Sequence, residues 1–101
     1  MLIHFAKKFS QTPQVLLRRC GYIPWRDRFS GEIKFIRRLT LAFYPRFHII
    51  YSFSAVGNLI LDLHLDSRRP MHKIGIRTSE SGESAVVQKE AERIKKILIN
   101  L

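Results

Sequence analysis

The chain has 101 residues, 46% of them apolar and 11% aromatic, which suffices for one domain with a single core. No apolar run approaches the ~20 residues of a membrane-spanning helix, and the apolar stretch at the N-terminus is too short for a secretory signal. The lone cysteine, Cys20, excludes an internal disulfide and suits a reducing compartment. We therefore expect one domain over residues 1–101, located in the cytoplasm and not associated with membranes.

The net charge of +10 is concentrated in one part of the sequence. Residues 1–77 hold 14 Lys or Arg and 4 Asp or Glu, whereas residues 78–101 hold four of each kind. A basic excess of this size raises the local concentration of polyanions at a protein surface. A role in solubility alone is the simpler alternative.

The N-terminal third predicts one well-delimited helix. Residues 1–11 are expected to be weakly ordered or to form a short helix. A helix is predicted to follow, because Thr12 can cap it, Pro13 suits its first position, and Gly21 can end it in a left-handed conformation. Residues 22–31 are predicted to form a loop, since they include proline, serine and glycine.

Three strands are predicted next, over about 33–39, 46–53 and 59–66, with a five-residue hairpin loop at 54–58. Pro45 has no N–H to donate, so the second strand should begin after it. Residues 67–81 read as a linker. The last helix should start between Ser81 and Ser84 and bury one stripe, formed by Val87, Ala91, Ile94, Leu98 and Leu101.

This order predicts a two-layer α+β fold, α-β-β-β-α, with a three-stranded antiparallel meander and both helices on one face. Side chains alternate across a strand, so odd and even positions form separate faces. The odd face of the last two strands is apolar: Phe47, Ile49, Tyr51, Phe53, Leu59, Leu61, Leu63 and Leu65. The even face carries the polar groups: Arg46, His48, Ser52, Asp62, His64 and Asp66, with Ile50 and Ile60.

The same parity restricts the register, because a slip by one residue would turn the leucines outward. With a five-residue loop, the hairpin pairs His48 with His64, Arg46 with Asp66 and Ile50 with Asp62. For the first two strands we expect Arg38 opposite His48 and Lys34 opposite Ser52. The two histidines should lie on the face away from the last helix.

Three interpretations of the polar face compete. It could be a solvated surface with cross-strand ion pairs, which are common and individually weak. It could bind zinc or manganese through His48, His64 and Asp62 or Asp66, but the positive field disfavours a cation, and no metal or other cofactor is expected. It could perform acid–base chemistry on a phosphodiester, with His48 and His64 as catalytic residues and nearby arginines holding phosphate oxygens.

The favoured function is a small basic binding module for RNA or another polyanion. The residues predicted to bind it are Lys34, Arg38, Arg46, Arg68 and Arg69. Trp25 and Tyr44 could stack on bases or cap an edge of the core. The alternatives are a ribonuclease that uses His48 and an adaptor for a protein partner, which should expose an apolar patch around Ile36, Ile50 and Ile60.

Several motifs resemble a family of short uncharacterised bacterial proteins, to which no activity is attached. The resemblance covers most of residues 13–99, through the segments 16–22, 36–39, 44–48 (Tyr-Pro-Arg-Phe-His), 63–66 (Leu-His-Leu-Asp) and 90–94. It implies a stable family domain.

The predicted topology is also similar to double-stranded RNA-binding domains and to HicA-type toxin ribonucleases. Residues 12–22 resemble the opening helix of the HicA type, which implies His48 as the catalytic histidine, although the Gly-Ser-His-His motif is replaced by Pro45-Arg46-Phe47-His48. Against the RNA-binding domains, the start of the last helix is acidic at Glu80 and Glu83, where that family places lysines.

Overall fold

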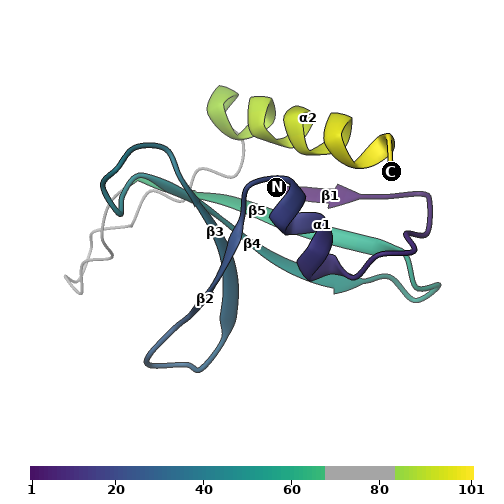
Figure 1. The fold of residues 1–101 in the computed structure, drawn as a ribbon, viewed down its shortest axis with the longest axis horizontal. Helices are drawn as coiled ribbons and strands as arrows, with labels where there is room; N and C mark the ends of the chain where they lie inside the picture. Colours follow the sequence, from purple (N-terminus) through teal and green to yellow (C-terminus); the bar gives the residue numbers. More distant parts are fainter. Residues whose placement is uncertain (68–83) are drawn as a thin grey trace.

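The computed structural model describes residues 1–67 and 84–101, which form an α+β fold with a five-stranded antiparallel sheet and two helices (Figure 1). The strand order across the sheet is β1-β5-β4-β3-β2. No helix in these residues is long and apolar enough to cross a membrane. Along the chain the elements are β1 (Leu2–His4), α1 (Pro13–Arg19), β2 (Ile23–Arg26), β3 (Ile33–Arg38), β4 (Arg46–Phe53), β5 (Leu59–Asp66) and α2 (Ala85–Ile99).

The α+β class is confirmed, but the predicted three-stranded meander lacks both edge strands of the sheet. β1 lies in the segment expected to be weakly ordered or helical, and β2 lies in the segment expected to be a loop. Strands of three and four residues are too short to show an alternating pattern, and their pairing partners decide their conformation. Pro24 is tolerated in β2 because this strand is at the edge of the sheet, where one side needs no donor.

The first helix begins at its predicted cap, and α2 begins at Ser84, the end of the range predicted for its start. The Thr12 hydroxyl accepts a hydrogen bond from the Val15 N–H at 3.4 Å, and the Ser84 hydroxyl accepts one from the Val87 N–H at 3.2 Å. Gly21 follows α1 with φ of 91°, the left-handed conformation that favours glycine. The linker predicted at 67–81 lies outside the described residues, except Ser67 at its start.

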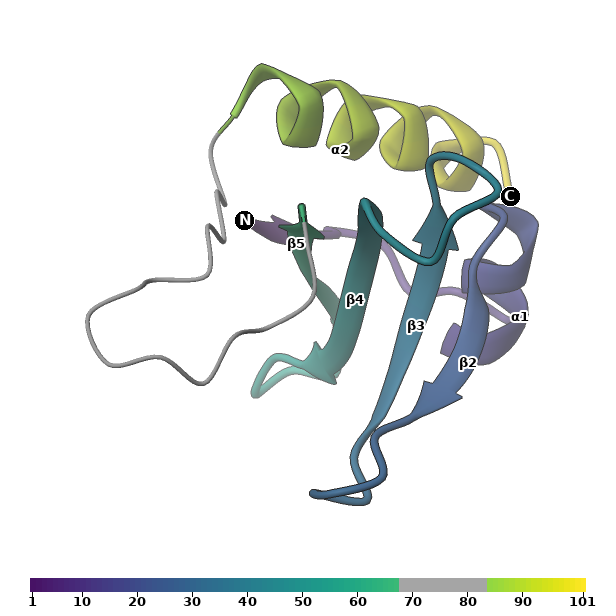
Figure 2. The same ribbon diagram turned by 90° about the vertical axis from the view of Figure 1, so that its left-hand side faces the viewer.

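One core joins the odd-numbered face of the sheet to both helices (Figures 1 and 2). It combines Leu16 and Leu17 of α1 and four predicted α2 residues with the sheet residues Ile3, Phe35, Phe47, Ile49, Leu59, Leu61 and Leu63. Leu101 is 40% exposed, because α2 ends at Ile99. Ile36 is 2% exposed but lies outside this core, on the opposite face.

The predicted β4–β5 register is confirmed: His48 pairs with His64, Arg46 with Asp66 and Ile50 with Asp62. The predicted β3–β4 register is wrong by two residues, because Ile36 lies opposite His48 and Arg38 opposite Arg46. Parity excludes only slips by an odd number of residues. The connection at 39–45 is longer than expected, and the Leu39 N–H donates to the Pro45 carbonyl at its base, at 3.1 Å.

Candidate nucleic-acid interface

The even-numbered positions of β3, β4 and β5, with the odd-numbered positions of β2, form a second face, opposite the core. The β2–β3 register places Trp25 opposite Lys34, and the β3–β4 register places Ile36 opposite His48. Because paired residues share a face, these side chains lie on the same side of the sheet as His64 and Asp66. We call this surface the even face; the helices pack on the other one.

Two histidines stack at the centre of the even face. The ring centroids of His48 and His64 are 5.0 Å apart, with an angle of 25° between the planes. The Nδ1 atom of His48 lies 2.9 Å from both carboxylate oxygens of Asp66, and the Nε2 atom of His64 lies 2.9 Å from Oδ1 of Asp62. The structure therefore confirms that the histidines are neighbours on the face away from α2, each beside its own carboxylate.

The centre of the even face is less accessible than the simple solvated-surface interpretation assumes. His48 is 3% exposed and Arg46 is 7% exposed. The Arg46 Nε–H donates to Oδ2 of Asp66 at 3.1 Å, and the guanidinium lies 4.4 Å from the Phe43 ring centroid and 4.8 Å from that of Tyr44. Arg46 is thus held within the protein by an ion pair and two aromatic rings.

The connection between β3 and β4 accounts for part of this burial. Phe43 contacts Trp25 of β2, with ring centroids 5.0 Å apart, as well as Arg46 of β4. These strands flank β3, so Phe43 lies over β3, where Ile36 is buried. Tyr44 packs edge-on against Phe43 and over Arg46, which is the capping role considered for it.

Asp66 is the shared acceptor of this cluster. Burial raises the pKa of its carboxyl, but the hydrogen bonds and charges of His48 and Arg46 outweigh burial and hold that pKa below its ordinary value of 3.8. Asp66 is therefore an anion at neutral pH and neutralises the buried arginine.

The remaining predicted binding residues divide into two groups. Arg38 is exposed at the end of β3, and Lys34 is half-buried opposite Trp25. Arg68 and Arg69 lie outside the described residues. Trp25 is 42% exposed. A hollow of about 410 Å³ lies at the start of β2 and the end of β3, lined by Gly21, Ile23, Ile36, Arg37, Arg38 and Thr40.

The expected apolar patch around Ile36, Ile50 and Ile60 is absent, since Ile36 is buried and the other two are half-buried. Several exposed apolar side chains lie instead on β2, on β3 and in the connections around them. They are Ile23, Trp25, Phe29, Ile33, Leu39 and Leu41.

A second polar cluster, under α2, escaped prediction. Glu90 is 4% exposed; it accepts hydrogen bonds from the Tyr22 hydroxyl at 2.6 Å and from the Arg93 guanidinium at 2.7 and 2.8 Å, while Nη1 of Arg37 lies 3.6 Å away. Burial raises the pKa of Glu90, but these partners outweigh it and lower the pKa below 4.5. Two signals pointed to this cluster: Arg37 interrupts the apolar positions of β3, and Glu90 precedes Ala91 in the buried stripe of α2.

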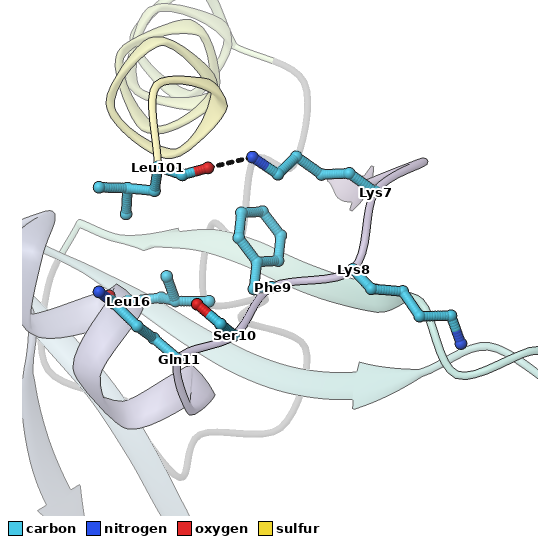
Figure 3. A pocket seen from close by; sticks show the side chains of 7 residues that line it. All are labelled: Lys7, Lys8, Phe9, Ser10, Gln11, Leu16 and Leu101. Atoms are coloured by element: carbon cyan, nitrogen blue, oxygen red, sulfur yellow. Dashed lines mark hydrogen bonds between the residues drawn. The ribbon is translucent and has the colours of Figure 1, made fainter.

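A second hollow lies on the helix side of the molecule, between the segment after β1 and the end of α2 (Figure 3). Lys7 and Lys8 line this space of about 330 Å³, but Lys7 donates to the Leu101 carbonyl and Lys8 to the Val56 carbonyl at 2.6 Å. Because both ammonium groups serve internal hydrogen bonds, this hollow is a weaker candidate than the even face.

Comparison of the chain with protein-family models, with curated proteins and with solved structures gave no match. Within residues 1–67 and 84–101, no group of three or more His, Cys, Asp or Glu side chains is arranged to hold a metal ion.

Proposed function

We propose that the protein is a small basic module that binds RNA or a chemically similar polyanion on the even face. The observation that carries this proposal is the position of exposed Arg38 and half-buried Lys34 on a helix-free sheet face, beside an exposed tryptophan. Guanidinium and ammonium groups bind phosphate oxygens, and the +10 charge draws a polyanion to the surface.

The acidic side chains of this face do not cancel its positive character. Asp66 is paired with Arg46 and His48, and Asp62 lies against His64. Arg38, by contrast, has no ion-pair partner among the residues that the structure describes. A phosphate can therefore bind the guanidinium of Arg38, whereas the guanidinium of Arg46 is already paired with Asp66. Arg46, one of the residues predicted from the sequence to bind the ligand, thus stabilises the even face and does not contact the ligand.

Salt-dependent titration of a labelled mixed-sequence RNA tests the proposal. We expect binding at least as tight as the ~10⁻⁴–10⁻⁶ M of non-specific complexes, with affinity falling as salt rises. Arg38→Gln should weaken binding and reduce the log–log salt slope by about 0.7, the value for one phosphate contact to a single strand. Arg18→Gln is the matched control, because it makes the same change at an exposed position of α1, and it should alter the slope less.

Binding that is absent, or that does not respond to salt, would overturn the proposal and favour a protein-partner adaptor. The RNA recovered from the titration also tests the ribonuclease alternative, which is supported by the two histidine–aspartate pairs. We expect intact RNA, because His48 is 3% exposed and therefore out of reach of a phosphodiester at the surface. Cleavage slowed ~10²–10⁴-fold by His48→Ala would instead establish catalysis.

A further inference from the structure

We infer that the ligand of the even face is single-stranded nucleic acid, with an unpaired base packed against Trp25 and Ile23 and its phosphate on Arg38. This inference rests on the proposed function and adds the substrate class and the subsite. It is carried by three features of the β2–β3 pair: an accessible indole, an exposed isoleucine two residues before it, and an arginine without an ion-pair partner among the described residues.

The indole of Trp25 is both accessible and supported. It is 42% exposed on an edge strand, yet its ring centroid lies 5.0 Å from that of Phe43, with 57° between the planes. Phe43 is in turn fixed against Arg46 and Tyr44. A supported, partly open aromatic ring is the kind of platform on which single-stranded bases stack.

The hollow at the start of β2 is lined by both apolar and charged side chains, and Ile23 connects it to Trp25. Ile23 precedes Trp25 by two residues on the same side of β2, so the two side chains are about 7 Å apart, and Ile23 pairs with Ile36 across the strands. Arg38 and Thr40 lie on the rim. Arg37 also lines the hollow, but Glu90 neutralises it, which leaves Arg38 as the available cation there.

This combination discriminates between forms of RNA. In a duplex the bases are stacked on each other and the outer surface is sugar and phosphate, so an exposed indole and isoleucine would find no apolar partner. An unpaired base offers both faces for stacking while its backbone phosphate stays within reach of an arginine. A polyanion without bases would use Arg38 and Lys34 but gain nothing from Trp25.

Because Trp25 is the only tryptophan of the chain, its fluorescence reports directly on the subsite. We expect saturable quenching by a short unstructured oligoribonucleotide, and weaker binding with little quenching by a duplex of the same sequence or by inorganic polyphosphate. Trp25→Leu, which keeps an apolar contact for Phe43, should weaken single-strand binding roughly 5- to 140-fold, measured by anisotropy of a labelled oligonucleotide. Phe53→Leu is the matched control, since Phe53 is 55% exposed on β4 at an odd-numbered position, and it should bind like the wild type.

The outcomes separate this inference from the proposed function. Salt-sensitive binding of single strand and duplex with equal affinity, with Trp25→Leu and Phe53→Leu both unchanged, would overturn the single-strand inference and leave polyanion binding intact. Absence of binding by every nucleic acid would overturn both. Circular dichroism of Trp25→Leu must match the wild type, and Arg38→Gln, which removes no packing, provides an independent variant of the same subsite.

Discussion

Asp66 holds together two of the buried polar side chains of the even face. Its carboxylate accepts the Arg46 Nε–H and faces Nδ1 of His48, while the buried Nη1 of Arg46 has no hydrogen-bond partner among the described residues. Removing one member of a buried charged group leaves the others without compensation, which costs more than the group itself contributes. The stability of the face should therefore depend on Asp66 more than on its neighbour Asp62.

We expect Asp66→Asn to lower the free energy of unfolding by about 1–3 kcal/mol, measured by urea denaturation. Asp62→Asn is the matched control: the Asp62 side chain is 40% exposed, so the same change should cost less than about 1 kcal/mol. Equal losses in the two variants would show that burial does not set the importance of Asp66.

The effect of Asp66 should also depend on pH in a defined direction. Its pKa in the folded protein is below 3.8, whereas an unfolded chain has an Asp pKa of ~3.9. A lowered pKa stabilises the folded state above the unfolded pKa, and that stabilisation is lost as pH falls below about 4 and through the folded pKa. The difference between wild type and Asp66→Asn should shrink in acid, and a difference that persists there would contradict this assignment.

At the scale of elements, α2 is attached to the sheet by polar as well as apolar contacts. Glu90 links the helix to Tyr22, which precedes β2, and to Arg37 of β3, and Arg93 donates to the Cys20 carbonyl at 2.5 Å. Burial raises the pKa of the Cys20 thiol to about 11. Burial, together with the hydrogen bond to Glu90, also raises the pKa of the Tyr22 hydroxyl. Cys20 is thus a structural cysteine with little thiolate at neutral pH.

Glu90→Gln should destabilise the protein by about 1–3 kcal/mol, since it leaves two guanidinium groups without their counter-charge. Glu92→Gln makes the identical change two residues along the same helix, at an exposed position, and should stay within about 0.5 kcal/mol of wild type. Thermal unfolding followed by circular dichroism at 222 nm would compare them. A Glu92→Gln effect as large as that of Glu90→Gln would rule out the buried cluster as the cause.

The elements that sequence could predict are those with long periodic patterns or specific caps. β4 and β5 show eight-residue alternation, and α1 and α2 have cap residues and apolar stripes, so their existence, faces and β4–β5 register follow from the sequence. β1 and β2 are decided by their partners, and the β3–β4 register depends on a loop whose fold over Ile36 has no local signal. The pairing of the two histidines could be predicted from parity. The burial of Arg46 and the hollow lined by Ile23 could be recognised only in the three-dimensional structure.

For the whole molecule, the two faces of the sheet have different roles. The odd-numbered face forms the core with both helices, and the even face presents a central polar cluster beside Trp25, Lys34 and Arg38. Other exposed cations occur elsewhere, including Arg18 and Arg19 at the end of α1, so net charge alone does not identify the binding surface. A test of the central claim must therefore locate the ligand on the protein.

Amide and indole chemical-shift mapping of the isotope-labelled protein during titration with a single-stranded oligoribonucleotide is the most direct measurement. We predict that the signals of the Trp25 indole N–H and of the amides of Ile23–Arg26 and Ile33–Arg38 shift most. The amide signals of α1 and of the exposed side of α2 should remain near the chemical shifts of the ligand-free protein. Largest shifts at Arg18, Arg19 and the lysines of α2, with Trp25 unaffected, would contradict assignment of binding to the even face.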